Sequence, residues 1–139
     1  MNFIDVRGGT KFQKEVAFKV VSQMISELMP RMRTLEISVR IRKFSDDAIG
    51  YCMMEDTNRQ FEIEVSKDLS LKDFVTALCH EMVHAKQYAR NEMSDDVKNR
   101  RWKKTTVPNS VGYWDLPWEK EAYRMEDKLT QIVWEKNIL

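Results

Sequence analysis

Three stretches of the chain repeat their hydrophobic residues every three or four positions, which is the period of an amphipathic helix. The first follows Thr10 and Gln13, a pair typical of a helical capping box, and ends before Pro30. The second covers about residues 71–91 and the third about residues 117–136. The pattern therefore predicts three helices.

Between the first two of these stretches, hydrophobic and polar residues alternate, which is typical of strands with one face in water. The alternation is clear over residues 35–42 and 61–65 and weaker over residues 49–55. Because the connections are short, we predict a three-stranded, mainly antiparallel sheet. Residues 92–116 are polar, contain Pro108 and show no period, so we expect them to be irregular.

The order of these elements predicts a single α+β domain over residues 1–139, in which helices cover a small sheet. Hydrophobic residues make up 42% of the chain, which is enough for a core, and the net charge of +1 gives no bulk attraction for nucleic acid. No apolar run reaches the roughly 20 residues of a membrane span, and we see no secretory signal. Cys52 and Cys79 form no CxxC pair. We therefore expect a cytoplasmic protein with reduced thiols and no membrane partner.

The only two histidines of the chain, His80 and His84, stand four positions apart with Glu81 between them. A helix turns about 100° per residue, so both imidazoles share one face, away from the centre of the hydrophobic stripe. Zinc ligands must converge on one point, and a neighbouring carboxylate can take a proton from the activated water. We interpret the motif as a catalytic zinc site with Glu81 as general base. The alternative is a pair of surface or structural histidines beside an ordinary glutamate.

A catalytic zinc ion usually has three protein ligands, and no third histidine exists. On the last predicted helix, Glu121 lies at the edge of the hydrophobic stripe, where a carboxylate is costly unless it is paired or binds a metal. We therefore predict Glu121 as the third ligand. The alternative is that Glu121 pairs with Lys128 or with an arginine. Glu119, which falls outside the stripe like Glu126, is the second candidate for the ligand.

HEMVH on one helix, followed about forty residues later by WEKEA on another, resembles the zincin metallopeptidases. The pattern is most similar to small gluzincin-type domains, including SprT-like and ImmA/IrrE-like intracellular zincins and their phage-encoded versions. The resemblance covers most of the chain and implies a zincin-like minimal domain that binds one catalytic Zn2+ and cleaves a protein or peptide substrate. It assigns His80, His84 and Glu121 as ligands and Glu81 as base. The chain lacks the downstream histidine and the cysteine zinc ribbon of SprT proteins proper, which weakens the expectation of a SprT-like role in DNA repair.

Three tyrosines are candidates for stabilising the oxyanion of such a reaction, namely Tyr88, Tyr113 and Tyr123. Tyr88 lies one turn beyond His84 on the same face of the predicted helix, and Tyr113 lies in the segment before the last helix. Tyrosines in such positions more often serve in packing. An exposed edge of the sheet could hold an extended substrate by strand addition.

A basic segment, KNRRWKK, raises a different class of function. Arg100, Arg101, Lys103 and Lys104 could bind phosphates, and Trp102 could stack on a base. The alternative function is therefore a DNA- or protein-binding module on a zincin scaffold, either catalytically idle or acting as a DNA-stimulated protease. The plainer interpretation is a solvated loop.

Overall fold

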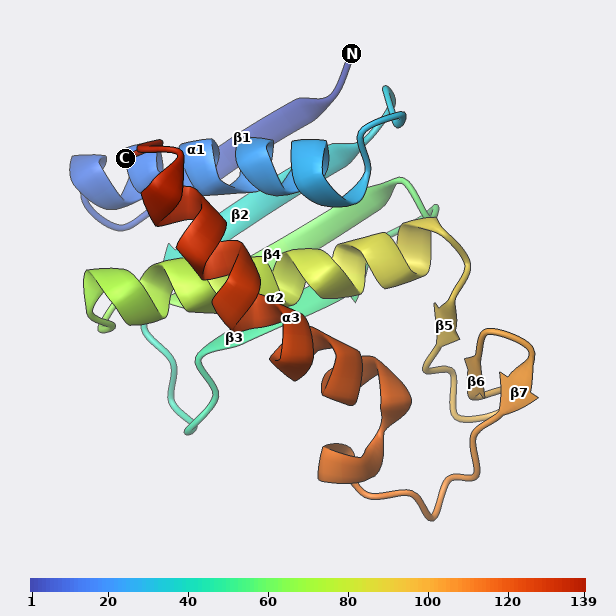
Figure 1. Ribbon diagram of the computed structural model, residues 1–139. Coiled ribbons are helices and arrows are strands. Elements are labelled where there is room, and N and C mark those ends of the chain that lie inside the picture. Colours follow the sequence, from blue (N-terminus) through green and yellow to red (C-terminus); the bar gives the residue numbers. More distant parts are fainter.

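The computed structural model describes residues 1–139 as three helices, a four-stranded mixed sheet and a small three-stranded antiparallel sheet (Figure 1). The elements are β1 (Phe3–Gly8), α1 (Lys11–Leu28), β2 (Glu36–Arg42), β3 (Gly50–Met54), β4 (Gln60–Ser66), α2 (Leu71–Ala89), β5 (Met93–Ser94), β6 (Arg101–Trp102), β7 (Thr105–Thr106), the 3-10 helix η1 (Tyr113–Asp115) and α3 (Pro117–Glu135). The helices α1 and α2 cover one face of the larger sheet, and α3 crosses α2 on the outside (Figure 1). The α+β class and the three predicted helices are confirmed.

The ends of the helices follow from local capping. Thr10 Oγ1 accepts a hydrogen bond from the backbone N–H of Gln13, and the Gln13 side chain accepts one from the backbone of Thr10, which completes the predicted capping box of α1. Ser70 caps α2 by accepting from the N–H of Asp73 at 3.2 Å. These bonds fix the residues at which α1 and α2 begin.

The sheet differs from the predicted three-stranded antiparallel meander in strand number and in direction. The strand order is β1-β2-β4-β3, with β1, β2 and β4 parallel and only β3 antiparallel, at the edge beside β4. The helix α1 connects β1 to β2 and allows them to run parallel. The inward side chains of β4 are fully buried, whereas in β3 Cys52 is half-buried and Met54 is exposed, so β4 takes the central place and β3 the edge.

The strand β1 was not predicted, although its sequence carries the signal. Ile4 and Val6 are half-buried against the core, while Phe3, Asp5 and Arg7 point to solvent. This alternation is short and lies before the first helix, so it is easily overlooked.

The core lies between the larger sheet and the helices α1 and α2. Its centre is formed by Val20, Met24, Ile37, Val39, Phe61, Ile63, Val75, Leu78 and Met82. Burial of each such side chain contributes about 1.5–3 kcal/mol. The opposite face of the sheet is mostly charged, with Phe3, Tyr51 and Met53 among its exposed residues. On it Arg42 Nε donates to Glu64 Oε2 at 2.8 Å. All helices therefore gather on one side, where the candidate site is built.

Residues 92–116, which were predicted to be irregular, contain the short strands β5, β6 and β7 and the 3-10 helix η1. Lys103 adopts a left-handed conformation, with φ of 55°, in the turn between β6 and β7. The segment leads from the end of α2 to the start of α3 and so brings α3 back across α2 (Figure 1). None of the helices combines the length and the apolar character that crossing a membrane requires.

Candidate metal centre

His80 and His84 lie one turn apart on the side of α2 that α3 crosses, and their ring centroids are 4.9 Å apart. Only 6% of His80 and 7% of His84 is exposed. The sheet-facing side of α2 is taken by core residues such as Val75 and Met82. The prediction that the two imidazoles share a face away from the centre of the core is therefore right, and α3 buries them.

Glu119, in the first turn of α3, is the carboxylate that meets both histidines. Its Oε1 atom lies 3.0 Å from Nε2 of His80 and 3.1 Å from Nε2 of His84. One donor atom from each of these three residues lies within 4.8 Å of the other two. Tetrahedral zinc, with bonds of about 2.0–2.1 Å, separates its ligand atoms by about 3.3 Å. The two imidazole nitrogens and one carboxylate oxygen therefore fit a zinc ion in both chemistry and spacing.

Glu121, predicted as the third ligand, does not face the histidines. Its Oε1 atom accepts hydrogen bonds from Lys86 Nζ at 2.9 Å and from Gln87 Nε2 at 3.1 Å. Residues 119 and 121 point about 200° apart on a helix, so α3 can direct only one of them at the pair. The structure thus corrects the prediction and brings Glu119, the second candidate, to the imidazoles.

Glu121 is a buried carboxylate, as its place at the edge of the hydrophobic stripe predicts, but its partner is a lysine and not the candidate metal centre. Glu121 is 9% exposed, and its charge is met by Lys86 of α2, with Arg124 further away at 3.8 Å. Lys128 is not among its partners. Glu119 and Glu126 stand seven positions apart, two helical turns, so they share one face of α3. That spacing was the sequence signal that could have identified the side of α3 facing the histidines.

The other ring nitrogen of each histidine is held by a hydrogen-bond acceptor. His80 Nδ1 lies 2.7 Å from Glu126 Oε2, and His84 Nδ1 lies 2.7 Å from Gln87 Oε1. An amide oxygen can only accept, so Nδ1 of His84 carries a proton, and Nε2, which faces Glu119, is the ring atom that could bind a metal. Glu126 orients His80 in the same way. Such outer partners fix the rings of metal-binding histidines.

Gln87 is itself fixed by two acceptors. Its Nε2 group donates to the backbone carbonyl of Trp118 at 3.0 Å and to Glu121 Oε1 at 3.1 Å. The residue is fully buried, and these two acceptors determine which end of its amide faces His84. Glu121 therefore belongs to the support of the site, since it holds the residue that orients His84.

The candidate ligands stabilise positive charge between them. Burial by itself would lower the pKa of His80, but hydrogen bonds to Glu119 and Glu126 outweigh it and raise the pKa to about 9. Burial would raise the pKa of Glu119, but hydrogen bonds from His80 and His84 outweigh it and lower the pKa to about 2. The same nitrogen and oxygen atoms can bind either protons or a divalent cation.

Glu81 lies beside this group and takes no part in its hydrogen bonds. It is 6% exposed and packs against Gly50 of the edge strand β3. A Cβ atom at Gly50 would stand 3.0 Å from Glu81 Oε2 and 3.1 Å from its Cγ, so the glycine makes room for the carboxylate. Burial raises the pKa of Glu81 to about 6, against the opposing effect of His84 and His80.

Two of the three candidate tyrosines reach the centre from the η1–α3 side. Tyr113 Oη lies 3.3 Å from Glu119 Oε1 and 3.0 Å from Tyr123 Oη. The Tyr123 ring packs on His80 with centroids 4.5 Å apart. Tyr88, in contrast, donates its hydroxyl to Asp95 at 2.7 Å. Of the three tyrosines, Tyr113 is thus the one whose hydroxyl forms a hydrogen bond with a candidate ligand.

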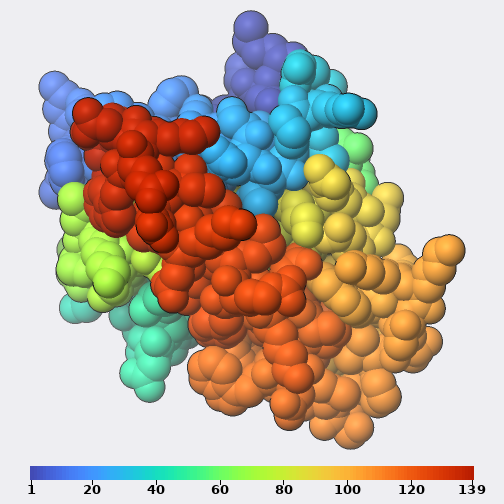
Figure 2. Space-filling view, in the orientation of Figure 1, coloured from blue at the N-terminus to red at the C-terminus, as the bar shows by residue number.

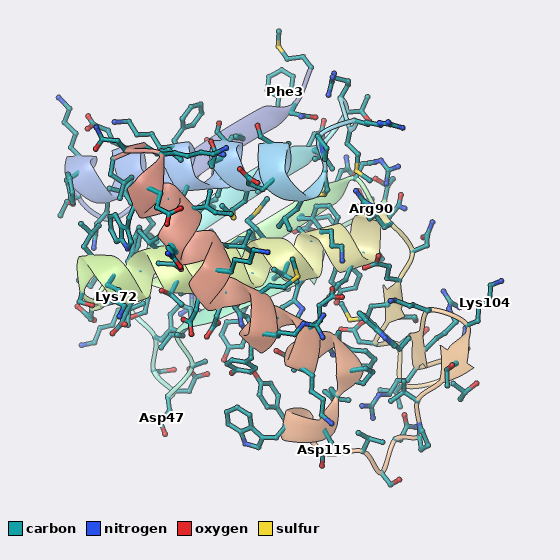
Figure 3. The ribbon with its side chains drawn as sticks, in the orientation of Figure 1. Phe3, Asp47, Lys72, Arg90, Lys104 and Asp115 are labelled. Carbon is teal, nitrogen blue, oxygen red and sulfur yellow. The ribbon has the colours of Figure 1, made fainter.

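A cleft of about 550 Å³ opens above these residues. Its walls are the loop before β3 and β3 itself on one side, and η1 with the start of α3 on the other. In Figure 2 the teal loop around residue 47 stands apart from the orange segment around residue 115, with the opening between them. Figure 3 labels Asp47 and Asp115 at the tips of these two walls. The candidate metal ligands and Glu81 therefore lie where a molecule can reach them.

The basic segment lies outside this cleft. The Arg100 guanidinium stacks over the Trp118 ring at 5.5 Å, and the Lys103 ammonium lies over the Trp102 ring at 5.3 Å. Arg101 is half-buried, and Lys104 points outward at the tip of the hairpin (Figure 3). Lys103 thus covers one face of the Trp102 ring, which leaves only the other face for stacking on a base. The contact of this segment with nucleic acid stays a prediction.

Comparisons with protein-family models, with curated proteins and with solved structures give no match to this chain. The likeness to zincins therefore depends on the HEMVH motif and on the geometry of the residues around it.

Proposed function

We propose that this protein is a zinc-dependent metallopeptidase of the zincin type, which hydrolyses a peptide bond in a protein or peptide substrate. One observation carries the proposal. The Nε2 atoms of His80 and His84 and Oε1 of Glu119 converge at the base of an open cleft, with the carboxylate of Glu81 beside them. In this assignment Glu119 takes the ligand role that the sequence suggested for Glu121.

The ligand set favours a catalytic role over a structural one. Two imidazoles and a carboxylate are ligands that zinc prefers, and structural zinc sites are usually closed by four protein ligands. Here three protein donors converge and the space beyond them is the cleft. A zinc ion held there would supply Lewis acidity, polarising the substrate carbonyl and lowering the pKa of a water molecule.

Glu81 is the proposed general base. It takes the proton of the attacking water and returns it to the leaving amine. Its contact with Gly50 keeps this carboxylate against the edge strand β3. The residues of β3 pair only with β4, so their other edge can bind an extended peptide by strand addition and bring the scissile bond to Glu81.

Tyr113 is the proposed donor to the carbonyl oxygen of the substrate. Its hydroxyl donates only a long hydrogen bond of 3.3 Å to Glu119 Oε1, which it can exchange for one to the substrate, and it lies 3.0 Å from the hydroxyl of Tyr123. A donor positioned in advance stabilises negative charge that develops on the carbonyl oxygen during attack. Tyr88 is occupied by Asp95 and takes no such role.

Metal analysis and one variant test the proposal. Protein purified after metal-replete expression should contain about one zinc ion per chain, because one set of ligands is present. Glu81→Gln should keep this zinc and should no longer hydrolyse peptides of a diverse library. Mass spectrometry of the library before and after incubation measures the cleavage. Less than about a tenth of an equivalent of zinc, or a Glu81→Gln variant as active as the wild type, contradicts the proposal.

A further inference from the structure

Every charged residue of the cleft apart from the histidines is acidic. Its carboxylates belong to Asp47, Glu81, Asp95, Glu119 and Glu126, and no lysine or arginine lines it. The whole chain carries a net charge of +1, so the cleft differs sharply from the average of the protein. Five carboxylates carry −5, and one divalent cation among them would leave −3. A site that is walled by protein concentrates such a field and attracts groups of the opposite charge.

Two of these carboxylates flank the reactive centre along the cleft. Thr76, His80, His84 and Tyr88 line it at intervals of one helical turn, so it follows α2 for about 18 Å. Asp95 lies at the Tyr88 end, where it accepts the tyrosine hydroxyl.

Asp47 lies toward the opposite end of the cleft. Gly50, the first residue of β3, contacts Glu81, whereas Met54 at its end pairs with Phe61, whose ring lies 6.1 Å from that of Tyr88. The strand β3 therefore runs toward the end of the cleft at which Tyr88 and Asp95 lie. The loop residue Asp47, three positions before Gly50, therefore lies on the other side of the centre (Figure 3).

Aromatic side chains line the cleft among the carboxylates. Trp114 is 71% exposed at the rim, with its ring 5.1 Å from that of Tyr113 and 5.4 Å from that of Tyr123. Tyr51 and Tyr88 line the side near β3 and α2. Exposed aromatic faces bind the cationic head and the aliphatic stem of lysine and arginine. The combination of carboxylates and aromatic rings matches these two side chains better than acidic or purely aliphatic ones.

We propose that the cleft selects peptides with lysine or arginine on both sides of the scissile bond, and that Asp47 and Asp95 determine this specificity. The inference deepens the proposed peptidase function and rests on it for the cleavage step. Selective binding, however, can be measured without cleavage. Asp47 faces the residues on one side of the bond and Asp95 those on the other.

Binding to the zinc-loaded Glu81→Gln protein tests the inference directly. The probes are three fluorescently labelled decapeptides that differ only in having lysine, glutamine or glutamate at alternate positions. Fluorescence anisotropy at low salt measures their binding. The lysine peptide should bind at least about tenfold more tightly than the glutamine peptide, and the glutamate peptide more weakly still. The preference should shrink in about 0.5 M salt, where exposed charges are screened.

Matched variants locate the effect. Asp47→Asn and Asp95→Asn should each weaken binding of the lysine peptide by about two- to fivefold and leave the glutamine peptide unchanged. Asp127→Asn removes the same charge from an exposed position of α3 outside the cleft and should change neither. Equal binding of the lysine and glutamate peptides overturns the inference. So does an Asp127→Asn effect as large as that of Asp47→Asn, because the preference would then reflect bulk charge.

The two proposals fail in different ways. If wild-type protein with one zinc ion binds the lysine peptide selectively but does not cut lysine- or arginine-containing peptides, the peptidase function is contradicted and the selectivity stands. If it cuts glutamate-containing peptides as fast as lysine-containing ones, the selectivity is contradicted and the peptidase function stands.

Discussion

The two helices that meet at the candidate metal centre contribute to it in different ways. From α2 come His80, Glu81 and His84, within five consecutive residues whose relative positions follow from helical geometry alone. From α3 come Glu119 and Glu126, whose positions relative to the histidines depend on how α3 crosses α2. The relative positions of the α2 residues are therefore fixed by the local sequence, whereas the positions of the α3 residues depend on packing between two helices that are distant in sequence.

The largest expected effect separates the two glutamates of α3. Glu119→Gln should weaken zinc binding by more than about 100-fold, since it removes a charged ligand, whereas losses in the surrounding shell are usually 10- to 100-fold. Glu121→Gln keeps an acceptor for Gln87 and should retain about one zinc ion per chain. Competition with a chromophoric chelator measures both affinities. If Glu121→Gln lost more zinc affinity than Glu119→Gln, Glu121 would be the ligand and the assignment of Glu119 would be wrong.

The second prediction concerns the support on the α2 side. Gln87→Leu removes the acceptor of His84 Nδ1 and leaves Glu121 without one of its donors, so zinc affinity should fall by about 10- to 100-fold. The matched control is the double variant Gln87→Glu/Glu121→Gln, which keeps an acceptor for the ring and a hydrogen bond between positions 87 and 121, and it should bind zinc more tightly than Gln87→Leu. An unchanged affinity in Gln87→Leu would show that the bond to His84 plays no part in holding the metal.

The third prediction concerns the support from α3. Glu126→Gln keeps an acceptor for His80 Nδ1 but loses its charge, so zinc affinity should fall by about tenfold, at the low end of the range for such contacts. Asp127→Gln, at the neighbouring exposed position, serves as control and should have no effect. A larger loss for Glu126→Gln than for Gln87→Leu would mean that α3 contributes more of the support than α2.

The fourth prediction links the metal to stability. Zinc bound only by the folded protein should stabilise it by about 2.7 kcal/mol at a free concentration one hundred times the dissociation constant. Calorimetric melting with and without a chelator measures the shift. At that zinc concentration Glu119→Gln, which binds at least about 100-fold more weakly, should be stabilised by no more than about 0.4 kcal/mol. A zinc-dependent shift of full size in Glu119→Gln would place the bound metal elsewhere.

The smallest effect is expected on the open face of the sheet, far from both helices. The hydrogen bond from Arg42 holds the pKa of Glu64 below the ordinary value of 4.5. Because the folded-state pKa is lowered, the pair contributes stability well above pH 4.5 and loses it as the pH falls through the lowered value. Glu64→Gln should therefore cost about 0.2–1 kcal/mol at pH 7 and nothing in strong acid. Urea unfolding at pH 7 and in strong acid measures this difference in the free energy of unfolding, which should not depend on zinc.

The sheet shows the same division between local pattern and packing. Alternation located β2 and β4, and their burial is as expected, with Phe61 and Ile63 in the core. The short connections suggested that consecutive strands are antiparallel neighbours. The length of a connection, however, only limits which strands can pair and does not determine which of the possible pairs forms. The choice followed from burial, because the inward face of β4 carries Phe61, Ile63 and Val65 and is stabilised more at the centre than the inward face of β3, which begins with a glycine.

The sequence by itself determined the three helices, the α+β class and the shared face of His80 and His84, because capping and helical periodicity act within a few residues. It also indicated that α3 carries a buried carboxylate in need of a partner. Only the tertiary structure decided that this carboxylate, Glu121, pairs with Lys86 while Glu119 meets the histidines. The physical reason is that Glu119 and Glu121 point about 200° apart on α3, and only the packing of α3 against α2 determines which of these two sides faces the histidines.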